Sequence, residues 1–170
     1  MAAALRAHEA GALTELLAAH GRELQGVAHH ILRSRPDAEE VVMDTMVTAW
    51  QKSHTLRDDQ ALRSWLLTIA VRHALSRRRR RRHADEVLPA DFGAASSNAG
   101  ADDRVVLGEA MSRLPPRMRA ALSLHYYAGM TVAETASALG ISQNTVKTQI
   151  RTRLDRLRAV LGDASAAGWT

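Results

Sequence analysis

The sequence predicts an all-α protein with two small helical domains joined by a flexible acidic linker, the second domain containing a helix-turn-helix. Apolar residues recur at a three-to-four spacing over several long stretches, which is typical of amphipathic helices. Gly and Pro are sparse, at 10 and 4 of 170 residues, and two basic segments flank an acidic one. The expected boundaries are a first domain at 1–84, a linker at 85–103, a second domain at 104–162 and a tail at 163–170.

Composition limits the classes of function. A formal net charge of +5 favours a polyanionic partner, and a hydrophobic content of 46% is enough for a packed core. The absence of cysteine excludes disulfides and thiolate zinc sites. The eight histidines lack metal-binding spacing, and the sequence has no phosphate loop or nucleophile elbow, so we expect no metal, no cofactor and no enzyme. No run approaches the roughly 20 apolar residues that span a bilayer, so we expect a cytoplasmic protein without membrane insertion.

The first two predicted helices cover residues 10–33 and 37–52. Pro36 is expected to break the chain between them, and Asp37 to cap the second helix with Glu40 completing a capping box. The second helix has an apolar inward side, but its outward side also carries two apolar residues among polar ones. The outward side consists of Glu40, Met43, Asp44, Val47 and Gln51. Two apolar side chains on one outward face indicate a protein partner.

The third predicted helix covers residues 60–82 and is apolar on nearly all sides, which is typical of a helix buried among several others. It ends in six consecutive arginines, Arg77 to Arg82. Such a run is often a solvated tail, but as the continuation of a helix it can reach phosphates on several sides. Contacts of this kind favour nucleic acid and do not read its sequence.

Residues 131–154 have the pattern of a helix-turn-helix. Gly140 can adopt the left-handed conformation that ends a helix, and Ser142 can cap the next one. In the second helix Val146 and Ile150 belong to an apolar stripe. The inward residues expected in the first helix are Val132, Ala133, Ala136 and Leu139.

The opposite side of the second helix is rich in amides, hydroxyls and cations and has no acid before Asp155. Gln143 and Asn144 suit contacts with adenine, while Lys147 and Arg151 suit guanine or phosphate. A helical hairpin with a solvated face is the alternative, although such a face more often carries Glu–Lys pairs. The pattern therefore favours a helix that lies in the major groove of DNA.

Taken in order, these segments resemble the extracytoplasmic-function sigma factors of bacterial RNA polymerase. The segment 37–50 reads DAEEVVMDTMVTAW and resembles the part of that family that docks on core polymerase. From Leu62, the stretch LRSWLLTIAVRHALSRRRRR resembles the helix that opens and reads the −10 element. From Leu114, the sequence resembles the domain that reads the −35 element. The resemblance covers roughly residues 10–161 and keeps the family's order of motifs.

The resemblance implies three partners: the polymerase core, through its β′ coiled coil and β flap; promoter DNA; and an anti-sigma factor. It also implies that the acidic linker threads through the active-site cleft. The implied core-binding residues are Met43, Asp44, Val47, Trp50 and Gln51. The implied −10 residues are Arg57, Arg63, Trp65, Arg72, His73, Arg77, Arg78, Arg79 and Arg80. The implied −35 residues are Ser142, Gln143, Asn144, Thr145, Lys147, Thr148 and Arg151.

Two positions depart from the family pattern, because Arg72 and Ser76 stand where many relatives carry Asn and Asp. This leaves the −10 preference open. Two other functions remain as alternatives: a self-sufficient helix-turn-helix regulator, or an interaction protein whose arginines adhere to RNA. The docking-like segment 37–50 distinguishes a sigma factor from both alternatives.

Overall fold

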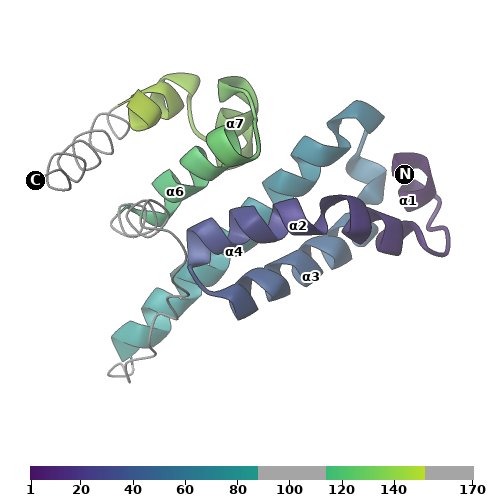
Figure 1. Cartoon of the computed structure of the whole chain (residues 1–170), viewed down its shortest axis with the longest axis horizontal. Coiled ribbons are helices and arrows are strands. Elements are labelled where there is room, and N and C mark those ends of the chain that lie inside the picture. Colours follow the sequence, from purple (N-terminus) through teal and green to yellow (C-terminus); the bar gives the residue numbers. More distant parts are fainter. Residues whose placement is uncertain (88–113, 152–170) are drawn as a thin grey trace, which may run out of the picture.

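In the computed structural model, the chain is described over residues 1–87 and 114–151, and all of its regular elements there are helical. Helices α2, α3 and α4 pack together, α6 lies against α2 and α4, and α7 lies against α4 (Figure 1). The N-terminal elements are α1 (Ala2–Arg6), α2 (Ala12–Leu32), α3 (Arg35–Gln51), two 3-10 turns (Ser53–Thr55 and Asp59–Ala61) and α4 (Leu62–Val87). The C-terminal elements are α6 (Pro116–Leu122), a π-helical turn (Ser123–Tyr127), α7 (Val132–Leu139) and a helical segment at 143–151.

The start of α3 differs from the prediction. Ser34, not Asp37, is the N-cap, and its hydroxyl accepts a hydrogen bond from the Asp37 amide at 3.4 Å. Pro36 lies in the first turn, where its missing N–H leaves no helical hydrogen bond unmade. The chain instead turns at Arg33, which has a left-handed φ of 58°. A helix capped three residues earlier leaves the Asp37 carboxylate available for a contact with α4.

The predicted inward side of α3 is confirmed. Its buried hydrophobic residues are Ala38, Val41, Val42, Met46 and Ala49. Thr45 is also fully buried, and its hydroxyl donates to the Val41 carbonyl at 2.6 Å, so the helix itself satisfies this polar group.

Helix α4 is buried around much of its circumference, as its apolar composition predicts. Leu66 and Ala70, and also Leu67 and Val71, are fully buried. Helices α2 and α3 both contact α4, and α7 and α6 contact it as well. The helix continues to Val87, three residues past the expected domain boundary. The rest of the predicted linker, the helix expected at 104–113 and the tail lie outside the described residues.

The helix-turn-helix is confirmed in its first helix and turn. Thr131 and Glu134 form a reciprocal capping box at the start of α7, and Gly140 ends this helix with a φ of 64°. Ser142 caps the next helix by accepting the Thr145 amide hydrogen bond at 3.1 Å. Ala136 and Leu139 are buried as predicted, but Ala133 is exposed, and Thr135 and Ala138 are buried instead. The inward face of α7 is thus rotated from the predicted one because this helix also packs on α4.

Candidate functional site

The outward face of α3 carries the strongest candidate for a protein-binding surface. Met43 and Val47 are 54% and 55% exposed, one helical turn apart, and Asp44 and Gln51 are exposed beside them. We call these four residues the α3 face. Large apolar side chains left in water on one helix face are typical of surfaces that a partner covers.

Trp50 does not share this exposure. Its ring is partly buried against the core and stacks on the His8 ring, with centroids 4.4 Å apart. The Nε2 atom of His8 also lies 3.2 Å from the Trp50 carbonyl and 3.3 Å from the Ser53 hydroxyl. The structure therefore places Trp50 in a packing position, supported by the segment that follows α1.

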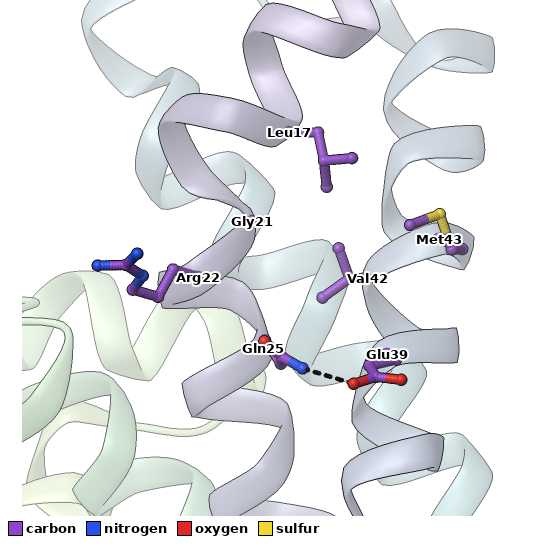
Figure 2. A pocket seen from close by; sticks show the side chains of 7 residues that line it. All are labelled: Leu17, Gly21, Arg22, Gln25, Glu39, Val42 and Met43. Carbon is purple, nitrogen blue, oxygen red and sulfur yellow. Dashed lines mark hydrogen bonds between the residues drawn. The ribbon is translucent and has the colours of Figure 1, made fainter.

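A hollow of about 300 Å³ adjoins the α3 face, between α2 and α3 (Figure 2). Gln25 donates a hydrogen bond to Glu39 at 3.2 Å across one end of the hollow. Its lining residues are Leu17, Gly21, Arg22, Gln25, Glu39, Val42 and Met43. The α2 residues that line this hollow were not predicted from the sequence to belong to a binding surface. The only local signal for them is Gly21, a helix-weakening residue in the middle of α2.

The predicted −10 residues fall into two groups. Arg57, Arg72, Arg79 and Arg80 are exposed. The others are engaged within the protein: Trp65 is partly buried against the core, and the Nε2 atom of His73 lies 2.9 Å from the Thr48 hydroxyl. Arg78 is partly buried, and Arg63 donates a hydrogen bond to the Ala128 carbonyl of the C-terminal part and pairs with Glu23 of α2.

Arg77 and Arg81 face α3 and form an ion-pair network with its first turns. The Nε atom of Arg77 donates to the Asp37 carboxylate at 3.1 Å, and Arg81 donates to the same carboxylate at 2.5 Å. Arg77 also pairs with Glu40. Burial alone would raise the pKa of Asp37, but the Ser34 hydrogen bond and the two arginines together lower it. Two of the run's arginines thus join α4 to α3.

The predicted −35 residues all lie on the exposed side of the C-terminal helical segment. Val146 is fully buried behind them and Ile150 is buried as well, so the apolar stripe of this helix faces inward. The Ser142 and Thr145 hydroxyls bond each other at 2.8 Å at the helix start. The exposed residues are Ser142, Gln143, Asn144, Thr145, Lys147, Thr148 and Arg151.

Within residues 1–87 and 114–151, no group of three His, Asp or Glu side chains is placed to hold a metal ion. No described helix combines the length and the apolar character that crossing a bilayer requires. The candidate sites are therefore surfaces for macromolecules: an apolar and acidic helix face, an arginine-bearing helix, and a polar helix presented by a helix-turn-helix.

Comparison with known proteins identifies the family. Residues 16–84 match Sigma-70 region 2, and residues 104–152 match Sigma-70 region 4. The ECF RNA polymerase sigma factor SigM of Mycobacterium tuberculosis is 33% identical over 162 residues, covering 93% of this chain and 83% of the relative. The chain belongs to the ECF sigma factors. Its function is promoter-specific initiation of transcription with RNA polymerase. This assignment favours a sigma factor over a self-sufficient regulator. Sigma factors are not in general enzymes.

Other relatives agree with this assignment. The ECF sigma factor RpoE of Cereibacter sphaeroides is 34% identical, with 71% of this chain and 70% of the relative covered. Among solved structures, CnrH in complex with the cytosolic domain of CnrY aligns over 99% of this chain and 96% of CnrH, with a TM-score of 0.67 and 26% identity. RpoE in complex with the anti-sigma factor NepR from Bartonella quintana aligns over 90% and 98%, with a TM-score of 0.73 and 23% identity, which shows the shared fold.

Proposed function

We propose that this sigma factor docks on core RNA polymerase through the α3 face and contacts promoter DNA through two separate helices. The segment from residue 143 would read the −35 element, and the exposed arginines of α4 would contact the −10 region. The observation that carries the docking proposal is the exposure of Met43 and Val47 beside an acid on one helix face.

The chemistry of the α3 face fits a helical partner. Met43 and Val47 are spaced to contact one side of an adjacent helix, and the neighbouring hollow can accept an apolar side chain from it. Asp44 adds a charge that would pair with a cation on the partner and fix the orientation of docking. The β′ coiled coil of the polymerase is the helical partner that we propose for this face.

The −35 proposal depends on the division of the C-terminal helical segment into two sides. Burial of Val146 holds the helix on the domain, so Asn144, Lys147 and Arg151 project away from it. Amide and guanidinium groups can make bidentate contacts with base edges in the major groove, and Lys147 can contact bases or phosphates. We place the −35 readout on these side chains, with the β flap of polymerase supporting the domain.

On α4, Arg72, Arg79 and Arg80 are the exposed residues best placed to contact the −10 region. Arg72 occupies the position where many relatives carry Asn, so we propose that a guanidinium replaces the amide contact there. Arg79 and Arg80 would contact phosphates and position the helix without reading the sequence.

An anti-sigma factor is the further partner that we propose. In the two solved structures, the sigma factor RpoE is bound to the anti-sigma factor NepR, and CnrH is bound to the cytosolic domain of CnrY. Because polymerase and promoter DNA are the other partners, we place the protein in the cytoplasm.

The docking proposal is tested with the double variant Asp44→Ala, Val47→Ala. Both side chains are exposed and alanine favours helix, so α3 should remain folded. We expect run-off transcription with purified core polymerase, and binding to that core, to fall by at least about tenfold, while binding of the free chain to DNA is unchanged. The control is Thr14→Ala, Glu15→Ala, at two exposed positions of α2 that belong neither to the α3 face nor to the lining of the hollow. Full transcription by the first variant would refute the docking face.

A further inference from the structure

The segment that precedes α2 is attached to the chain between α3 and α4. We call residues 52–61, which join these two helices and include both 3-10 turns, the connector. Helix α1 lies beside the connector (Figure 1). Ala2 and Leu5 of α1 are buried in the same core cluster as Leu56 of the connector. The apolar side of α1 therefore fixes this segment to the domain and brings its polar residues to the connector.

One arginine of α1 reaches two points of the connector. The Nη1 atom of Arg6 donates a hydrogen bond to the Leu56 carbonyl at 3.1 Å and lies 2.7 Å from the Asp59 carboxylate. An exposed ion pair by itself contributes little, because water screens it. Here the same nitrogen also bonds a backbone carbonyl, and the Leu56 side chain is anchored in the core. The guanidinium thus fixes the path of the chain between positions 56 and 59.

A histidine holds the other end of the connector. The His8 ring stacks on the Trp50 ring, and its Nε2 atom lies within hydrogen-bond distance of the Trp50 carbonyl and of the Ser53 hydroxyl. Ser53, where the first 3-10 turn begins, is 2% exposed. His8 has a left-handed φ of 53°, a conformation that costs free energy in a residue other than glycine. Because surrounding contacts must outweigh this cost, the backbone conformation of His8 indicates that its ring contacts are maintained.

Arg57 lies between the two connector residues that Arg6 holds. It is exposed, and it is one of the residues predicted to contact the −10 region. The carboxylate of the next residue, Asp58, accepts a hydrogen bond from the Gln60 amide at 2.9 Å and caps the second 3-10 turn. The backbone is therefore held on both sides of Arg57, while the Arg57 side chain faces solvent.

The ion pair of Arg6 also changes the charge beside Arg57. An unpaired carboxylate two residues away would attract the Arg57 guanidinium and repel a phosphate. Because Asp59 is paired with Arg6 instead, the charge of Arg57 remains available to a phosphate. A cation on a fixed backbone also loses less conformational entropy on binding than a cation on a mobile loop, which favours affinity.

We propose that Arg6 and His8 are positioning residues for promoter binding, which hold the connector so that Arg57 is presented to a phosphate of the −10 DNA. This inference rests on the proposed function, because it concerns the same contact with promoter DNA. It adds residues that lie outside both of the proposed DNA-binding helices. Neither Arg6 nor His8 needs to touch DNA, since both act through the connector.

The test measures how tightly the holoenzyme, formed from core polymerase and the full chain, binds a genomic fragment from which the parent initiates in run-off transcription. Arg6→Ala and Asp59→Ala remove the ion pair from its two sides, and Arg57→Ala removes the proposed contact itself. We expect each variant to weaken promoter binding about fivefold, the upper end for one exposed charged contact. Each should also lower the slope of log affinity against log salt concentration by about 0.7–0.9, the value for one phosphate.

The sign of the Asp59→Ala effect separates positioning from simple charge. Removal of an acid from a DNA-binding surface should strengthen binding on electrostatic grounds alone, whereas loss of the Arg6 contact should weaken it. In an Arg57→Ala background, Arg6→Ala and Asp59→Ala should cause no further weakening, because the side chain that they position is gone. A general structural role for Arg6 would persist in that background.

Three measurements complete the test. Glu9→Ala, at an exposed acid of the same segment, should not weaken promoter binding, and His8→Gly, which keeps the left-handed backbone but removes the ring, should weaken it. Binding to core polymerase should be unchanged in every variant, because the α3 face is intact. Asp59→Ala binding as tightly as the parent, Arg57→Ala having no effect, or Arg6→Ala acting equally in the Arg57→Ala background would each overturn positioning. Failure of the parent holoenzyme to initiate from any genomic fragment would instead refute the proposed function.

Discussion

The Asp37 carboxylate should be a main source of the stability of the α3–α4 pair, and Asp37→Asn tests this. The Asp37 side chain is only 8% exposed and accepts hydrogen bonds from Arg77 and Arg81. A hydrogen bond to a charged group contributes about 1.5–3 kcal/mol, and leaving a buried charge without its partner costs more. Two features reduce the loss: Arg81 is 53% exposed, and Arg77 keeps Glu40. We therefore expect a loss of about 2 kcal/mol.

Thermal unfolding followed by circular dichroism measures this loss. For a chain of this length, about 2 kcal/mol lowers Tm by roughly 4–8 °C. Asp44→Asn is the matched control, since Asp44 is an exposed acid on the same helix, and its Tm should stay within about 1 °C of the parent. An equally small change for Asp37→Asn would show that the arginine contacts add nothing.

The effect should also depend on pH in a defined direction. The pKa of Asp37 is lowered in the folded protein from its ordinary value of 3.8, so its contribution is complete above that value and is lost as the pH falls below it. Asp37→Asn and the parent should converge in stability at acid pH. A difference that persisted unchanged well below that value would contradict an ionic origin.

Two further predictions concern the C-terminal part and its packing against α2. Val146→Ala should destabilise the helix-turn-helix by about 2 kcal/mol, because Val146 is fully buried behind the polar face, and urea unfolding together with −35 DNA binding would detect the loss. Burial, and to a smaller extent the charge of the neighbouring His29, lowers the pKa of His30 from its ordinary value of 6.5. Tyr127 of the C-terminal part packs edge to face against the His30 ring. The neutral ring is thus favoured while Tyr127 packs against it, so acidification from about pH 7.5 to about pH 5.5 should lower the stability measured by urea unfolding, and His30→Gln should reduce this response.

Local pattern accounts for the elements that could be predicted. The inward side of α3 and the turn at Gly140 follow from helical periodicity and from the backbone preference of glycine, and both were confirmed. The start of α3 was predicted wrongly because Ser34 and Asp37 are both good caps, and the choice depends on where the carboxylate finds its partner. That partner, Arg77, is 40 residues away in the sequence.

The packing of the C-terminal part against α2 and α4 could not be derived from periodicity. Its contacts join residues far apart in the chain, such as Arg119 and Ile31 with a separation of 88. The sequence does not distinguish a buried arginine from an exposed one. The apolar composition of α4 showed that other elements must cover it, but not which ones. Gly26 was the one local sign, since a glycine inside a helix requires a reason such as the close approach of Tyr127.

The pairing of Arg77 and Arg81 with acids of α3 changes how the arginine run would behave toward a polyelectrolyte. Each phosphate that a cation neutralises releases roughly 0.9 counterion from B-DNA, and these released ions set the dependence of affinity on ionic strength. Two arginines held by carboxylates release none. The run should therefore bind DNA like a segment with about two charges fewer than its sequence suggests. Its non-specific affinity, which would hold the protein on random genomic DNA, is lower as a result.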